Sequence, residues 1–312
     1  MRKKFLLLFT TLLAFSLIFV GCAKKDNVAK QETKSSDKKI HVVTTTTMLK
    51  DLIEKVGGDK VEVEGLMGEG VDPHLYQATA SDVDKLKKAD VVVYQGLHLE
   101  GKMGDVFADL KNKQVIEAGK GVPSDQVKKE EDGNPDPHIW FNVKIWEEVG
   151  SYISKQLGEF YPEQKELFTK NFENYKKEME ELDKYIMAKA NEIPKEQRAL
   201  VTAHDAFSYF ADRYGFDVLA IQGVSTETEA TTADIEKLGQ QIVDRKIKAI
   251  FVESSVPEKT IKSLKDVVKA KGHNIEIGGE LYSDSLGDKE HNSEGYINTC
   301  KANIDIMYKA LK

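Results

Sequence analysis

Cysteine is nearly absent from this chain, which has two in 312 residues. Cys22 stands at the end of an N-terminal apolar segment where a lipid is expected to occupy it, so Cys300 is left without a partner. No intramolecular disulfide is then possible, and stability has to come from burial of a hydrophobic core. Cys300 is spaced from Tyr296, Ile304 and Met307 as residues on one face of a helix are, which predicts a small buried side chain rather than a reactive thiol.

Several motifs that mark common enzymes are also missing. The chain contains no His-Glu-x-x-His, no Gly-x-Ser-x-Gly and no Gly-x-x-x-x-Gly-Lys-Ser/Thr. The sequence therefore gives no support to a metalloprotease, a serine hydrolase or a nucleotide-binding protein of the kinds that these motifs mark.

An excess of positive charge is absent as well. The formal net charge is −7, and loss of residues 1–21, which carry three positive and no negative side chains, takes it from −7 to −10. This balance argues against nucleic acid as a partner.

The apolar N-terminus predicts secretion and lipid attachment. Arg2, Lys3 and Lys4 precede an apolar run over residues 5–20, shorter than the about 20 residues of a spanning helix, so residues 1–21 are interpreted as a signal peptide. Phe19-Val20-Gly21-Cys22 resembles the bacterial lipobox, which implies that Cys22 is acylated and inserts into the lipid bilayer. The polar residues 22–39 are expected to form a flexible tether.

The remaining chain alternates β-branched runs with helical stretches, which predicts βα units and mostly parallel sheets. The expected strands are 40–45, 61–66, 91–94, 114–116, 199–203, 218–222, 249–253 and 275–277. The expected helices between them are 48–56, 81–88, 206–214, 233–245 and 257–270. We therefore predict an α/β fold with two lobes, an N-terminal one at 40–161 and a C-terminal one at 194–312.

A single long helix is expected between the lobes, at residues 162–193. The stretch from Pro162 to Glu192 has no glycine and no internal proline, and Pro194 lies just past its end. Its apolar residues are spaced three or four apart: Phe168, Phe172, Tyr175, Met179, Leu182 and Ile186. The alternative is a coiled-coil dimer, but the flanking α/β units favour a rigid helix packed along both lobes of a monomer.

Two of the seven histidines occur in the same tripeptide, Asp72-Pro73-His74 and Asp136-Pro137-His138. Proline fixes its own φ and restricts the residue before it, so each tripeptide presents an imidazole from a stiff loop. The aspartates could accept a hydrogen bond from the ring nitrogen that does not bind a ligand. The repetition predicts metal binding.

Two further candidates come from the second half. His204 follows the apolar run 199–203, which places it at the carboxyl end of a strand, where ligands bind in open α/β sheets. Asp284 follows the last expected strand. Glu253 and Glu280 also end strands and are candidate acceptors behind the ligands, whereas His98, after another strand, is not expected to be a ligand.

Four segments, in this order along the chain, resemble the manganese and zinc solute-binding lipoproteins of ABC transporters, the TroA-like family. They are Gly70-Val71-Asp72-Pro73-His74-Leu75-Tyr76, Asp136-Pro137-His138-Ile139-Trp140-Phe141, Ala203-His204-Asp205-Ala206-Phe207 and Gly278-Gly279-Glu280-Leu281-Tyr282-Ser283-Asp284. The resemblance implies one divalent ion in an interlobe cleft, bound by His74, His138, His204 and Asp284. It also implies a lipid-anchored extracytoplasmic receptor that delivers the ion to a membrane permease.

The identity of the metal stays open between manganese, zinc and iron. Three imidazoles and a carboxylate suit Zn²⁺, and the Irving–Williams order places zinc above manganese. Zinc-dedicated relatives often carry a His-rich loop before the second ligand, however, and residues 121–137 contain no histidine. We expect Mn²⁺ as the cargo, with Zn²⁺ as the next candidate, although His204 stands where many manganese binders have Glu.

Two other functions compete with this interpretation. A zinc hydrolase needs an open coordination position for water, which four protein ligands would close. A surface adhesin is a role sometimes attached to the family, but the chain has no repeat or stalk that would support it.

Overall fold

The computed structural model describes residues 38–130 and 133–312, and residues 39–312 form one compact unit. The predicted signal peptide, the lipid attachment site at Cys22 and nearly all of the predicted tether lie outside the described residues. Among the described residues, no helix combines the length and the apolar character needed to cross a bilayer.

The N-terminal lobe is built on a four-stranded parallel sheet in the order β2-β1-β3-β4. Its strands are β1 (Ile40–Thr44), β2 (Val61–Gly65), β3 (Val91–Tyr94) and β4 (Gln114–Glu117). Its helices are α1 (Thr47–Gly57), α2 (Ala80–Lys88), α3 (Gly104–Ala108) and α4 (Val143–Phe160). The centre of this sheet is fully buried, as expected for parallel strands covered by helices on both faces.

The C-terminal lobe contains two parallel strand pairs, with β5 also packed against β7. Its strands are β5 (Ala199–His204), β6 (Asp217–Gln222), β7 (Ala249–Glu253) and β8 (Glu276–Leu281). Its helices are α6 (Ser208–Tyr214), α7 (Thr232–Arg245), α8 (Lys259–Ala270) and α9 (Gly295–Leu311). A core of its own joins these strands to α7 and α8 through side chains such as Val201, Ile242 and Leu264. The predicted α/β fold class is confirmed.

The last predicted strand, 275–277, was too short. The observed strand β8 continues through Gly278 and Gly279 to Leu281, with a bulge where the pairing shifts between Ile250 and Phe251. A Cβ atom on Gly278 would lie 2.8 Å from the ring of Phe251, so glycine is needed for the close approach. Gly278 therefore lets the strand pack closely against the aromatic ring.

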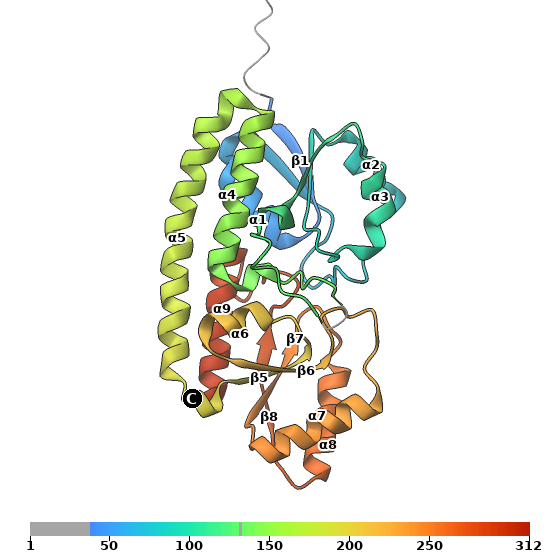
Figure 1. The fold of residues 1–312 in the computed structure, drawn as a ribbon, viewed down its shortest axis with the longest axis vertical. Helices are drawn as coiled ribbons and strands as arrows, with labels where there is room; N and C mark the ends of the chain where they lie inside the picture. The colour runs from blue at the N-terminus through green and yellow to red at the C-terminus, as the bar shows by residue number, and fades with distance from the viewer. Residues whose placement is uncertain (1–37, 131–132) are drawn as a thin grey trace, which may run out of the picture. The chain divides into compact units, whose positions relative to one another are not determined.

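The long helix is α5 (Lys165–Glu192), preceded by a 3₁₀ turn at Pro162–Gln164. It runs along one side of the molecule and packs against α1 and α4 of the first lobe and α6 and α9 of the second (Figure 1). The six apolar residues that predicted it are all buried in one core cluster. That face is therefore covered by the chain's own helices, of which α4 was not predicted.

Side-chain caps fix where two helices near the cleft begin. The carboxamide oxygen of Asn142 accepts hydrogen bonds from the backbone N–H groups of Lys144 and Ile145 at the start of α4. The hydroxyl of Thr46 accepts one from the N–H of Leu49 at the start of α1. Cys300 is buried in α9, as predicted, and burial raises the pKa of its thiol to about 12.

A charged contact fastens the second lobe to α5. Arg213 Nε donates to Asp183 Oδ1 at 2.9 Å, and the hydroxyl of Tyr214 donates to the same oxygen at 2.9 Å. Burial alone would raise the pKa of Asp183, but the hydrogen bonds from Arg213 and Tyr214 outweigh it and lower the pKa below 3.8.

We predict that Asp183→Asn lowers the free energy of unfolding by about 1–3 kcal/mol, because it weakens a charged hydrogen-bond network. Since the folded pKa is depressed, the contribution of Asp183 is present above its unfolded pKa and is lost as the pH falls through the folded value. Urea unfolding of both proteins should thus show a difference at neutral pH that shrinks below pH 3.8. Glu181→Gln, on an exposed face of the same helix, is the control; an equal effect there would contradict this role of Asp183.

Candidate metal centre

The structure brings the four predicted site residues together from four separate segments. His74 lies in the loop between β2 and α2, and His138 precedes the turn that leads into α4. His204 is the last residue of β5, and Asp284 follows β8. One ligand atom from each residue lies within 4.8 Å of the others.

The group is removed from solvent. His138 and His204 have 0 % exposure, Asp284 has 2 % and His74 has 3 %. The Nε2 atoms of all three histidines and both carboxylate oxygens of Asp284 have no hydrogen-bond partner. Because buried polar atoms are normally paired, five such atoms in one place indicate a site made for a ligand.

The distances fit a small cation. Asp284 Oδ1 lies 3.3 Å from His138 Nε2, and Asp284 Oδ2 lies 3.3 Å from His204 Nε2 and 3.8 Å from His74 Nε2. Ligands at 2.0–2.1 Å from a tetrahedral ion are about 3.4 Å apart. The four side chains can therefore hold one transition-metal ion with little rearrangement.

The repeated Asp-Pro-His tripeptide forms the same turn twice. In each copy an aspartate oxygen accepts a hydrogen bond from the backbone N–H of the histidine, at 2.9 Å from Asp72 Oδ1 and 2.9 Å from Asp136 Oδ1. Each imidazole is thus presented from a stiff loop, as the sequence predicted.

The two aspartates differ in their second contact. Asp136 Oδ1 also lies 2.8 Å from His138 Nδ1, which leaves Nε2 of that ring for a ligand. Asp72 makes a different contact from the predicted one to the ring of His74. Its Oδ2 accepts a hydrogen bond from Thr226 Oγ1 at 2.6 Å. Asp72 therefore links the His74 loop to the second lobe.

Glu253 supports His204, as predicted. Its Oε1 accepts the backbone N–H groups of Ala203 and His204 at 2.8 and 3.1 Å. Its Oε2 lies 2.7 Å from His204 Nδ1, an ion-pair distance without hydrogen-bond alignment. The same prediction is wrong for Glu280, which is exposed because strand alternation turns it away from the buried Leu281.

The electrostatics of the three imidazoles differ. Burial lowers the pKa of His74 to about 3, because it outweighs the opposing effect of Asp284, whose carboxylate is 3.8 Å away and would raise the pKa. Burial also opposes protonation of His138, but contacts with Asp136 and Asp284 outweigh it and raise the pKa to about 9. His204, beside Glu253 and Asp284, likewise has a raised pKa despite its burial. Burial would raise the pKa of Asp284, yet its two cationic neighbours hold it well below 3.8.

The segment around Asp284 is hydrogen-bonded to the first lobe. Trp140 Nε1 donates to the carbonyl of Ser283 at 3.1 Å, the N–H of Gly70 donates to Ser285 Oγ at 2.9 Å, and the N–H of Leu286 donates to Thr47 Oγ1 at 2.8 Å. Sequence reasoning missed these contacts. An available hint was Trp140, two residues after His138, whose ring lies 5.3 Å from that imidazole.

The other histidines lie outside the group of four. His41 Nε2 is 3.4 Å from Glu64, His273 Nε2 is 2.8 Å from the carbonyl of Ile247, and His291 Nδ1 is 2.8 Å from Asp288. His98 is exposed, as expected for a residue that is not a ligand.

Comparisons with known proteins agree with this geometry. The family model described as zinc-uptake complex component A, periplasmic, matches residues 42–310. The zinc-binding protein TroA of Treponema pallidum is 43% identical over 89% of this chain and 90% of its own length. Its solved structure matches with a TM-score of 0.86 over 88% of this chain and 99% of that one.

Other relatives are named for other metals. The manganese-binding lipoprotein MntA of Bacillus subtilis is 42% identical over 89% of this chain and 92% of its own length. Fe(III)-bound YtgA of Chlamydia trachomatis is 26% identical, with a TM-score of 0.79 over 88% of this chain and 98% of that one. The chain therefore belongs to the zinc-uptake complex component A family, the manganese- and zinc-binding substrate receptors of ABC transporters, which are not enzymes.

Proposed function

We propose that this chain captures one divalent transition-metal ion between His74, His138, His204 and Asp284 and delivers it to the permease of an ABC importer. The observation that carries the proposal is the cluster of buried, unpartnered donor atoms. Family membership supports an importer, and the chemistry of the donors supports a transition metal over Mg²⁺ or Ca²⁺, which prefer oxygen ligands.

Mn²⁺ is the proposed cargo, with Zn²⁺ next. Both oxygens of Asp284 face imidazoles, so the carboxylate can bind through two atoms and provide five donors in all. A higher coordination number suits Mn²⁺ better than the tetrahedral preference of Zn²⁺. Zn²⁺ is still expected to bind more tightly in a direct competition, because the Irving–Williams order applies to any such site. The metal carried by protein recovered from its native membrane decides between them.

The proposal places the receptor outside the cytoplasm as a monomer, held to the cell membrane through acylated Cys22. The apolar run at 5–20 and the lipobox-like tetrapeptide support this, as do relatives named as lipoproteins. Residues 22–39 would serve as the tether, and lobes at 40–161 and 194–312, joined by the helix at 162–193, as the receptor.

We predict that His74→Ala lowers the affinity for Mn²⁺ and Zn²⁺ by more than about 100-fold, because it removes one of the four ligand residues from a preorganised site. Isothermal titration of the metal-free chain measures the affinity, and circular dichroism checks that the fold is kept. His291→Ala, which removes an exposed imidazole, should bind normally. Normal binding by His74→Ala would contradict the proposed site.

We also predict that Glu253→Gln weakens metal binding by about 10–100-fold, the usual effect of removing an acceptor behind a metal-bound histidine. The matched control is Glu280→Gln, which makes the same chemical change at the end of the neighbouring strand but on an exposed residue. Equal affinities for the two variants, measured by competition with a chromophoric chelator, would show that Glu253 does not act through His204.

A further inference from the structure

An opening between the lobes lies beside the buried metal centre. The opening has a volume of about 190 Å³ and is lined by residues of both lobes, among them His98, Glu130 and Glu227. One candidate metal ligand, His74, also forms part of its wall, whereas His138, His204 and Asp284 do not. An arriving ion would therefore meet His74 first.

His74 makes this opening more than an accidental gap. Its side chain is only 3% exposed, and its Nε2 has no hydrogen-bond partner. A buried, unpartnered nitrogen at the inner end and carboxylates at the outer end form a path suited to a cation.

Glu227 lines the opening where it meets solvent, which we call the mouth, and forms an ion pair there with a lysine of the other lobe. Lys102 of the first lobe places its Nζ 3.7 Å from Oε1 of Glu227 in the second, and both side chains are partly exposed, at 35% and 47%. Glu130 is occupied differently, since its Oε1 accepts the backbone N–H of Val224 at 3.2 Å. Glu227 is thus a carboxylate at the mouth whose charge is neutralised by Lys102. An incoming cation can compete with Lys102 for it.

The segment that carries Glu227 is held next to the His74 loop. Thr226 donates to Asp72 at 2.6 Å, and Asp72 in turn accepts the N–H of His74. The N–H of Glu227 donates to Ser225 Oγ at 3.2 Å. Mouth and ligand are therefore connected by a short chain of hydrogen bonds.

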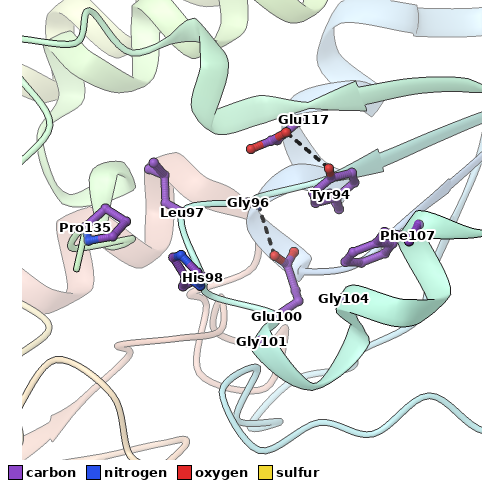
Figure 2. A pocket seen from close by; sticks show the side chains of 11 residues that line it. Tyr94, Gly96, Leu97, His98, Glu100, Gly101, Gly104, Phe107, Glu117 and Pro135 are labelled. Atoms are coloured by element: carbon purple, nitrogen blue, oxygen red, sulfur yellow. Dashed lines mark hydrogen bonds between the residues drawn. The ribbon is translucent and has the colours of Figure 1, made fainter. Parts of the chain in front are cut away.

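Two other residues that line the opening have a strained backbone conformation. Leu97 and His98 have φ values of 53° and 65°, which non-glycine residues rarely adopt. The buried carboxylate of Glu100 fixes the turn, since it accepts the N–H groups of Gln95 and Gly96 at 2.8 and 3.0 Å. Figure 2 shows Leu97 and His98 on the side of Pro135, away from Tyr94 and Phe107. Such strain at one point of a surface is typical of functional positions.

Building on the proposed function, we infer that the metal ion enters through this opening and that the Lys102–Glu227 ion pair controls the rate of capture. The ion displaces the ammonium group of Lys102 from Glu227, passes His98 and is bound by His74 before the remaining ligands. Glu227 and Lys102 are positioning residues in this account, because they do not touch the bound ion. They should affect how fast the ion arrives more than how tightly it is held.

Stopped-flow mixing of the metal-free full chain with Zn²⁺ or Mn²⁺ tests this inference, with tryptophan fluorescence as the reporter because the ring of Trp140, one of two tryptophans, lies near His138. At low ionic strength Glu227→Gln should slow association by about threefold to tenfold, and Lys102→Gln should accelerate it by a similar factor. Both effects should fade as salt is added. The equilibrium dissociation constant should change less than the association rate.

Two matched controls separate the mouth from general surface charge. Glu229→Gln makes the same change two residues away on an exposed side chain outside the opening, and Lys88→Gln does so at the exposed end of α2. Unchanged rates in Glu227→Gln and Lys102→Gln, or equal changes in the controls, would overturn the inference. Opposite effects of the two mouth variants support it, because general loosening of the structure would shift both rates in one direction. Failure of the unmodified chain to bind either metal would instead reject the proposed function.

Discussion

The structure depends on one buried carboxylate. Asp284 is 2 % exposed, and both its oxygens face imidazole nitrogens that have no other partner. An isolated charge in such a place would cost several kcal/mol, so it must be balanced by cations. The raised pKa values of His138 and His204 favour protonated, positively charged rings that balance the carboxylate. A divalent ion would balance it better by replacing these protons.

The surrounding architecture holds these donors at one point. Two ligands come from each lobe, and α5 packs against helices of both, which limits how far the lobes can separate. Asp284 belongs to the second lobe by sequence, but its neighbours Ser283, Ser285 and Leu286 are hydrogen-bonded to the first. Any motion that releases the ion must therefore break these bonds or separate Asp284 from His204, which Glu253 holds within the second lobe.

Much of this arrangement was predictable from local sequence. The long helix follows from six apolar residues at helical spacing, and His74 and His138 follow from a repeated tripeptide whose turn is local. His204 and Asp284 each follow a predicted strand, but their assignment as ligands rested more on the family resemblance. The contacts of Thr226, Ser283 and Ser285 were not predictable, because they depend on how the lobes meet and a single hydroxyl in a loop has no pattern. Strand β8 was predicted too short, because the β-branched run ends at Ile277 and the glycine that continues the strand serves close packing against Phe251.

Anomalous X-ray scattering from crystals of the Zn²⁺-loaded chain would test the central claim most directly. The account predicts one strong peak about 2.0–2.2 Å from Nε2 of His74, His138 and His204 and from a carboxylate oxygen of Asp284. A metal-loaded protein whose peak lies elsewhere, or whose peak omits any of these four residues, would contradict it.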